Sequence, residues 1–297
     1  MTIADYLYAT VAYGDIFDYP LSGDDVYYWS IQKIPRKNFR AHPIPGIAHS
    51  QYFYYLKGRE SIVSTYNDRH SYSKTKWETA RSVGLWLQFI PTIFLVGVTG
   101  GVAMNNASSH DDIDFFFVTA KGTMWISRLL VILALDVVGK RRKPSDTNVT
   151  NRICLNMFMS EDAMSLPSRE RDLFSAHEVL QMEPIWSRRD TYRRFLQANN
   201  WVKEYLPVAW SIRQSGFNRH PKISHWYTRV TRNVLRWFEF PAKYFQLWYM
   251  ARRRTHEVIS EGVLRFHPKD ARIKIRTELA KRLKKRNIPL DNVFYAR

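Results

Sequence analysis

The stretch that decides the fold runs from residue 96 to residue 118 and reads VGVTGGVAMNNASSHDDIDFFFV. The apolar run at 93–98 has the length and the β-branched content of a buried strand, and it leads into a turn at Thr99, Gly100 and Gly101. Further along the chain, Asp112 and Asp114 open a second apolar run, 113–118, which predicts another strand. The stretch therefore predicts two strands of a small sheet, with a glycine turn leaving one and two acids entering the other.

The acidic pair predicts metal chemistry. Asp112 and Asp114 are two residues apart, so on a strand their side chains point to the same face. Their charges repel unless a cation lies between them, and carboxylate oxygens favour Mg²⁺ or Mn²⁺ over zinc. Gly100 and Gly101 would let the backbone approach a polyphosphate closely. The spacing predicts a metal–phosphate site; the plainer alternative is a glycine turn beside an exposed acidic pair.

The turn and the acids together resemble the signature of the DNA polymerase β-like nucleotidyltransferases. The resemblance implies Mg²⁺-dependent transfer of a nucleoside monophosphate from an NTP, such as ATP, to a hydroxyl acceptor. It places the phosphates at Gly100 and Gly101 and the metal on Asp112 and Asp114. The wider chain is similar to prokaryotic nucleotidyltransferase-domain proteins in FDYPL at 17–21, TGGVAMNNA at 99–107, RICLN at 152–156 and Trp-Val-Lys at 201–203.

A third carboxylate, which many members of that family carry on a later strand, is not evident. The run 152–159 predicts that strand, and Asn156 stands where the acid is expected. An amide cannot act as a base, although its oxygen can ligate a metal or orient a substrate. We expect Asn156 to be the third site residue, with Asp136 as a less favoured substitute. If neither serves, the alternative is a catalytically inactive protein of the same fold that binds nucleic acid or has a regulatory role.

Several polar residues near these motifs have two interpretations each. Thr99, Asn105 and Asn106 could hydrogen-bond phosphate or cap the helix after the turn, and Lys121 or Arg128 could contact a triphosphate. We expect solvent or packing roles for the others, which are Asp111, His110, His177 and the small apolar Cys154.

The chain is expected to be an α/β protein of the α+β kind, with a small mixed sheet. Helices are predicted at 3–13, at 24–34, over 60–89 as one or two segments, and at 124–138, and an aromatic strand is predicted at 51–56. After Pro167 the pattern predicts helices to the end, broken at prolines. The predicted parts are a winged-helix-like unit at 1–58, a nucleotidyltransferase core at 59–165 and a basic, aromatic helical region at 166–297.

The positive charge is concentrated near the C-terminus. The chain has 45 Lys and Arg against 27 Asp and Glu, and its formal net charge is +18. Most of the surplus lies after residue 210, where 272–286 predicts an amphipathic helix with a basic face. That face could recruit RNA or another phosphate-rich acceptor, or it could simply be solvated. The tryptophans and tyrosines of the same region could stack on bases or form a helical core.

The chain carries no sign of export or of a membrane span. Its single cysteine excludes a disulfide framework, and the first ten residues lack the basic start of a signal peptide. The most apolar segments are interrupted, by Gln88 and Pro91 in one and by Arg128 and Asp136 in the other. We therefore expect a cytoplasmic protein with no membrane partner.

Overall fold

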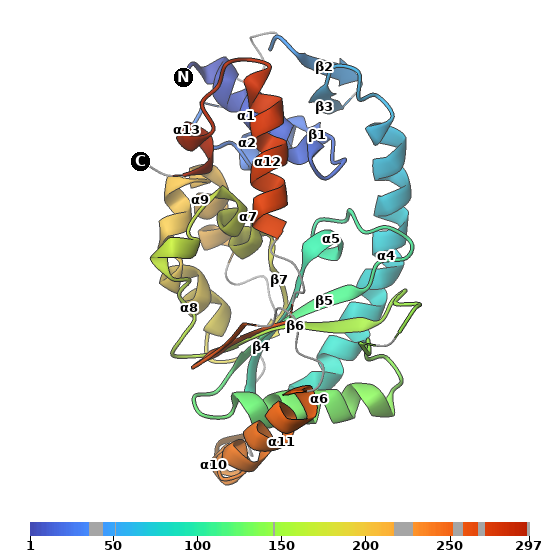
Figure 1. Cartoon of the computed structure of the whole chain (residues 1–297), viewed down its shortest axis with the longest axis vertical. Helices are drawn as coiled ribbons and strands as arrows, with labels where there is room; N and C mark the ends of the chain where they lie inside the picture. The colour runs from blue at the N-terminus through green and yellow to red at the C-terminus, as the bar shows by residue number, and fades with distance from the viewer. Residues whose placement is uncertain are drawn as a thin grey trace.

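The computed structural model describes residues 1–35, 44–50, 52–144, 146–216, 228–251, 258–266 and 271–295. Helices surround a six-stranded mixed sheet (Figure 1), so the expectation of an α+β protein with a mixed sheet is confirmed. The described strands are β1 Leu21–Ser22, β2 Ile47–Ser50, β3 Phe53–Leu56, β4 Ile93–Thr99, β5 Ile113–Thr119, β6 Ile153–Ser160, β7 Glu183–Ser187, β8 Val258–Ser260 and β9 Val263–Arg265.

The predicted helices at 3–13, 60–89 and 124–138 are confirmed. They correspond to α1 Ile3–Asp15, to α4 Ile62–Trp86 with the short η1 Leu87–Phe89, and to α6 Met124–Val137. The other described helices are α2 Gly23–Tyr28, α5 Gly100–Ala103, η2 Ser168–Glu170, α7 Leu173–Gln181, α8 Thr191–Ala198, η3 Asn200–Glu204, α9 Pro207–Ser215, α10 Thr228–Arg236, α11 Glu239–Ala251, α12 Ala271–Lys284 and α13 Asp291–Phe294.

The central sheet has the strand order β7-β4-β5-β6-β9-β8. Strand β4 pairs antiparallel with β5 and β7, whereas β5 and β6 run parallel. The three strands predicted at 93–98, 113–118 and 152–159 are thus adjacent, and their predictions are confirmed. Because β5 and β6 are parallel, the residues that open them lie at the same edge of the sheet.

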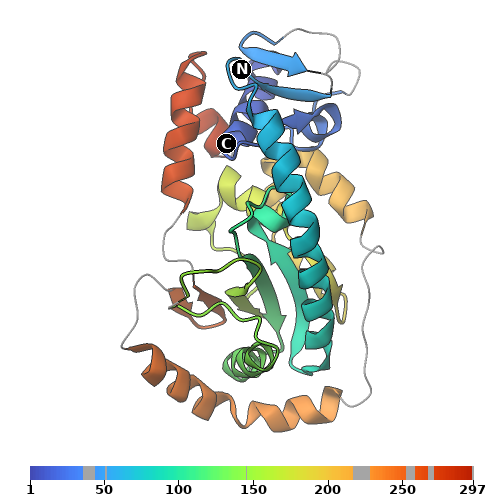
Figure 2. The ribbon, with the colours of Figure 1, turned by 90° about the vertical axis from the view of Figure 1, so that its right-hand side faces the viewer.

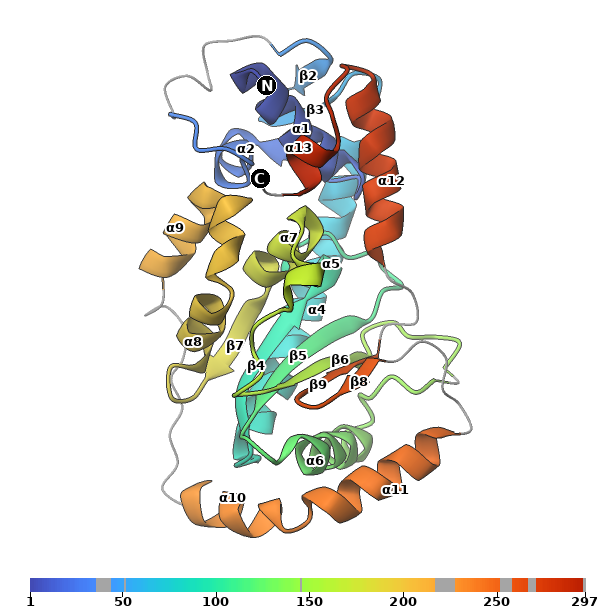
Figure 3. The same ribbon diagram turned by 60° about the vertical axis from the view of Figure 1, so that its left-hand side comes forward.

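Alternation along the strands divides the core into two layers. Phe116 and Val118 of β5 pack in one core cluster with α7, α8 and α9, while Phe115 and Phe117 pack in another with α4, α6 and α11. Asp114 is two residues before Phe116, so its side chain faces the α7 layer. Figure 3 shows α7 and α8 on one side of the sheet and α6 with α11 on the other.

The helical prediction after Pro167 is wrong at three strands, β7, β8 and β9. Pro184 does end a helical segment, since α7 stops at Gln181, but the residues that follow pair with β4 as strand β7. Proline has no N–H to donate, and β7 can hold it because β7 is an edge strand. The predicted helix at 24–34 is also too long, because α2 ends at Tyr28.

The C-terminal helix α12 returns to the N-terminal unit, which consists of α1, α2 and the small sheet β1-β3-β2 (Figure 1). The predicted amphipathic pattern is confirmed: Ile275, Leu279 and Leu283 are buried and line one face. On the same helix, Arg282 Nε lies 2.8 Å from Asp15 Oδ2. Part of the basic charge is therefore used within the fold.

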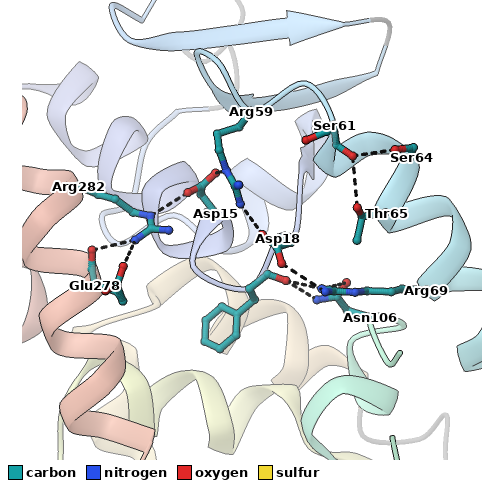
Figure 4. A network of polar contacts seen from close by, with 11 residues as sticks. Asp15, Asp18, Arg59, Ser61, Ser64, Thr65, Arg69, Asn106, Glu278 and Arg282 are labelled. Carbon is teal, nitrogen blue, oxygen red and sulfur yellow. Dashed lines mark hydrogen bonds and ion pairs between the residues drawn. The ribbon is translucent and has the colours of Figure 1, made fainter. Parts of the chain in front are cut away.

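A polar network joins the N-terminal unit to the glycine-turn region (Figure 4). Arg59 of the loop after β3 contacts Asp15, with Nε 2.9 Å from Oδ1. The Phe17 carbonyl accepts hydrogen bonds from Arg69 Nη1 at 2.8 Å and from Asn106 Nδ2 at 2.9 Å. These contacts fix the segment around Phe17 against the loop that follows α5.

The helix α11 lies across α6 at the far end of the molecule (Figure 2). Gln246 of α11 is buried and donates from Nε2 to the Trp125 carbonyl at 2.8 Å. Within the described residues, no helix combines the length and the apolar composition that crossing a bilayer requires.

A buried lysine on α4 ties two loops together. Lys76 is 1% exposed, and its Nζ donates to the Ser109 carbonyl at 3.2 Å, the Asp111 carbonyl at 2.6 Å and Asn151 Oδ1 at 3.0 Å. Those acceptors immediately precede β5 and β6. Lys76 therefore links the two loops from which strands β5 and β6 begin.

Replacing Lys76 should destabilise the protein. The Lys76→Met variant removes the donor of three part-buried charge-assisted hydrogen bonds, so we expect a loss of roughly 2–4 kcal/mol in the free energy of unfolding. The matched control is Lys74→Met on the exposed face of the same helix, expected within about 0.5 kcal/mol of wild type. Chemical denaturation measures both, and equal losses would contradict the role given to Lys76.

Candidate functional site

The glycine turn lies against one of the two acids. Strand β4 ends at Thr99, and the chain turns at Gly100, whose φ is +66°. A Cβ on Gly100 would be 2.9 Å from Asp114 Oδ2, and a Cβ on Gly101 would be 3.3 Å from Ala107 Cα. At Gly100, both the left-handed backbone and the close carboxylate exclude a side chain. The turn is therefore built around the Asp114 carboxylate.

Strand pairing brings one further group to the acids. Thr99 pairs with Asp114, and Asp114 pairs with Cys154. One ligand atom each from Asp112, Asp114 and Cys154 lie within 4.8 Å of one another, and all three residues are partly buried. The expectation that Cys154 is simply a small apolar residue is wrong, because its Sγ belongs to this polar cluster.

An arginine already contacts the cluster. Arg142 Nη1 lies 2.6 Å from Asp112 Oδ2 and 3.8 Å from Cys154 Sγ. The predicted pair is thus asymmetric: Asp112 has a cationic partner, whereas Asp114 lies deeper. Arg142 belongs to the basic run that follows α6, and its role was not predicted from the sequence.

The electrostatics favour a hard cation at Asp114. Burial, together with the nearby charge of Asp112, raises the pKa of Asp114 to about 7. Burial and the charge of Asp114 also raise the pKa of the Cys154 thiol, which keeps its proton near neutral pH. A protonated thiol is a poor ligand, so the carboxylates are the ligands on offer. Carboxylate oxygens suit Mg²⁺ or Mn²⁺.

Asn156 lies at the same site as Asp114. It is 7% exposed and lines, with Thr99, Gly100 and Asp114, a cavity of about 730 Å³. Its Nδ2 donates to Thr99 Oγ1 at 3.3 Å, while its buried Oδ1 has no hydrogen-bond partner among the described residues. An unpaired buried amide oxygen beside a carboxylate is a group that a bound cation or donor would satisfy.

A third acid near Asp114 comes from helix α7 and was missed by sequence reasoning. Glu178 lines the same cavity as Asp114 and Asn156, and its charge contributes to the raised pKa of Asp114. Burial raises the pKa of Glu178 itself to about 7. The available signal was a single acid in the otherwise uncharged helix LFSAHEVLQ, but the sequence does not show which face of the sheet that helix covers.

A smaller cavity of about 120 Å³ also adjoins the turn. It is lined by Gly100, Gly101 and Glu178, among others, and its aromatic walls include Tyr13 and Phe17. Gly100 and Glu178 also line the larger cavity, so the two spaces meet at the turn. Among the predicted site residues, Asp112 lines neither cavity.

The other candidates have partners away from this cluster. Asn105 Oδ1 accepts from Trp77 Nε1 at 3.0 Å, so it holds the turn. Lys121 pairs with Asp162 at 3.1 Å, Arg128 reaches Gln246 at 2.5 Å, and Asp136 pairs with Arg141 at 2.7 Å. The structure thus gives Asp136 no place beside Asp114, and Lys121 and Arg128 contact other elements.

The expected packing or solvent roles are confirmed for His177, His110 and Asp111. His177 is buried and stacks on Tyr13 with ring centroids 4.0 Å apart, and burial lowers its pKa to about 3. His110 and Asp111 are exposed, and Asp111 Oδ2 accepts from the Ser108 N–H at 2.7 Å.

Removing the Asp114 carboxylate should stabilise the protein at high pH. The folded pKa of about 7 lies above the ordinary value of 3.8, so wild-type stability falls as pH rises through this range. Asp114→Asn does not titrate, and we expect its stability relative to wild type to increase by roughly 2–3 kcal/mol between about pH 5 and pH 8. Denaturation at both pH values, with and without Mg²⁺, measures this.

The control for this experiment is Asp136→Asn, which removes an acid from α6 that is paired with Arg141. Mg²⁺ should reduce the difference between wild type and Asp114→Asn, because a bound cation stabilises the wild-type carboxylate. Parallel stability curves for wild type and Asp114→Asn would show that Asp114 does not titrate as described.

Comparison of the chain with protein-family models, with curated proteins and with solved structures found no match in any of the three. The candidate site is therefore described by its geometry alone: Gly100, Asp114, Asn156 and Glu178 line one cavity, and Asp112 lies beside Asp114 outside its lining.

Proposed function

We propose that the protein is a metal-dependent nucleotidyltransferase that moves a nucleoside monophosphate from an NTP to a hydroxyl acceptor. The observation that carries the proposal is the cavity at which Thr99, Gly100, Asp114 and Asn156 meet, with Asp112 two residues from Asp114. In this proposal the central sheet is a nucleotidyltransferase core, and α1, α2 and the small sheet form a winged-helix-like unit.

The residues present fit a divalent cation. Asp112 and Asp114 would hold it, and the unpaired Oδ1 of Asn156 would complete or orient the set. What Mg²⁺ or Mn²⁺ supplies in such a site is neutralisation of triphosphate charge and a lower pKa for the attacking hydroxyl. The proposal places the phosphates in the larger cavity next to the turn at Gly100 and Gly101, where Thr99 offers a hydroxyl donor.

Glu178 is the group best suited to take the acceptor's proton. It lines the cavity with Asp114, and its pKa of about 7 allows it to accept a proton near neutral pH. In the transfer, the acceptor oxygen would bond to the α-phosphorus, pyrophosphate would leave, and the hydroxyl proton would pass to Glu178. The acid thus comes from a helix above the sheet instead of from strand β6.

A second candidate function is a catalytically inactive protein that binds nucleotide or nucleic acid. It is favoured by the contact at 2.6 Å between Arg142 and Asp112, because a guanidinium there competes with a cation for that carboxylate. In the active protein, Arg142 would shift to the triphosphate when the cation binds.

The acceptor is proposed only by class: an RNA end, a small hydroxylated molecule or a protein side chain. Several cations of α12 and of the turn after it have acidic partners: Arg272 of α12 lies 2.7 Å from Asp172, and Arg286 lies 3.3 Å from Asp5. Lys274, Lys284 and Lys285 remain exposed and could contact a phosphate-rich acceptor. A cytoplasmic location, suggested by the single cysteine, is likewise part of the proposal.

The transfer activity can be tested directly. Purified protein is incubated with each α-labelled NTP, Mg²⁺ and either RNA, small hydroxylated compounds or protein, and label on the acceptor is measured. Asp112→Asn and Asp114→Asn should lose transfer and bind Mn²⁺ at least roughly tenfold more weakly. The control Asp136→Asn should retain both. Mn²⁺ and NTP binding without transfer to any acceptor would favour the inactive candidate.

The role of Glu178 gives a separate prediction. Glu178→Gln keeps the shape but cannot accept a proton, so kcat should fall roughly 10²- to 10⁴-fold while Mn²⁺ binding stays unchanged. Wild-type activity should rise with pH through about 7, as Glu178 ionises, and the variant should lack this limb. The control is Glu170→Gln, whose carboxylate lines the same cavity but is 2.5 Å from Arg265. Equal losses in both variants would exclude a specific role for Glu178.

A further inference from the structure

The outer face of α11 is unusually apolar for a helix at the end of a molecule. Ala242, Gln246 and Met250 form its buried face, at a spacing of four residues. On the remaining surface of α11 and its junction with α10, large hydrophobic side chains are exposed, and Trp237 is 84% exposed. They are Val234, Trp237, Phe238, Phe240, Tyr244, Phe245, Trp248 and Tyr249, which we call the aromatic face.

The aromatic face lies on the opposite side of the sheet from the candidate site. Helix α11 packs against α6 in the core layer formed with Phe115 and Phe117, whereas Asp114 faces the α7 layer. Figures 1 and 3 show α10 and α11 at one end of the molecule and the N-terminal unit at the other. The face is therefore separate from the proposed chemistry.

The charge around the aromatic face is positive. Residues 228–251 contain four basic residues and one acid, Glu239, and the next three residues in the sequence are all arginines. The Glu239 carboxylate points inward, where it accepts N–H groups of Trp125 at 2.9 Å and Ile126 at 3.0 Å. The single acid of this segment thus caps α6, and residues 228–251 have a net charge of +3. Among their basic side chains Arg236 is exposed, while Arg232 and Lys243 are half-buried.

The positive net charge of residues 228–251 favours some partners of an apolar surface over others. A second copy of the chain would bring like charges together across a symmetric contact, which disfavours self-association. Single-stranded RNA is usually bound in a basic groove, whereas the exposed aromatic side chains of α10 and α11 stand on helices at the outside of the molecule (Figure 2). An anionic bilayer surface offers both negative charge and an apolar layer to a protruding helix.

The dimensions agree with a helix that lies on a bilayer. The 13 residues of α11 span about 20 Å, which is shorter than the hydrocarbon core. Tryptophan and tyrosine are the residues that favour the membrane interface, and basic residues at its edge contact lipid headgroups. The expectation of no membrane partner rested on the absence of a spanning segment, and a surface helix needs none.

We propose that α10 and α11 form a docking surface for an anionic lipid bilayer, with the aromatic face inserted at the level of the headgroups. This inference is independent of the nucleotidyltransferase proposal. Lipid binding uses no residue of the candidate site, so Asp112→Asn should bind vesicles like wild type.

The test is co-sedimentation of the full chain with vesicles. One set contains phosphatidylcholine alone, and the other also contains phosphatidylglycerol. We expect at least roughly tenfold stronger binding to the anionic vesicles, weakened by added salt. The triple variant Trp237→Ala, Phe240→Ala, Trp248→Ala should lose at least roughly tenfold in binding to those vesicles.

The matched control is Tyr52→Ala, which removes a side chain that is 78% exposed on the turn between β2 and β3. It should bind within about twofold of wild type. Lys243→Glu, a second variant on α11, should weaken binding to anionic vesicles without altering the circular dichroism spectrum.

Three outcomes would overturn the proposal. The first is no binding to anionic vesicles, or equal binding to both vesicle types. The second is a wild-type dimer, seen by sedimentation velocity, that the triple variant dissociates, which would assign the face to a second copy. The third is binding of single-stranded RNA, in the absence of vesicle binding, that the triple variant loses.

Discussion

The site depends on one buried ammonium group. Lys76 Nζ has three oxygen acceptors within 3.2 Å, two on the loop that leads to Asp112 and one on the loop that leads to β6. Burial lowers the pKa of Lys76, and the three oxygens stabilise its charged form, so the ammonium group links the two loops. The lysine thus holds together the loops that lead into the parallel strands β5 and β6. Asp114 and Cys154 pair near the start of these strands, so their relative position depends on the same contact.

At the start of strand β5, Asp114 and the turn residue Gly100 constrain each other. The Asp114 carboxylate lies 2.9 Å from the position that a Cβ on Gly100 would take, so the turn and the acid are in close contact. The charge that results is poorly solvated, as its raised pKa shows. Arg142 is bound to the neighbouring Asp112 at 2.6 Å, and its charge offsets only a small part of the burial of Asp114. The cluster therefore retains a preference for a further positive charge next to Asp114.

The sequence predicted the central strands and the grouping of Thr99, Gly100 and Asp114, because both follow from local patterns and strand alternation. Asn156 was also found, through the expected position of the later strand. Glu178, Arg142 and Lys76 were not, because their roles depend on how α4, α7 and the basic loop pack around the sheet. Strand β7 was missed for a related reason: Pro184 reads as a helix breaker, and its place at a sheet edge is a tertiary property.

The separation of the two faces of the sheet bears on how the protein would work. The α7 face holds carboxylates with raised pKa values around a cavity, where a cation or a substrate must supply the missing charge. The surface of α10 and α11 exposes aromatic side chains, and residues 228–251 have a net charge of +3, opposite in sign to the carboxylates of the α7 face. An anionic surface held at α11 would leave the cavity open on the opposite side, since the whole sheet lies between them. Docking and chemistry could then proceed at the same time without competing for one surface.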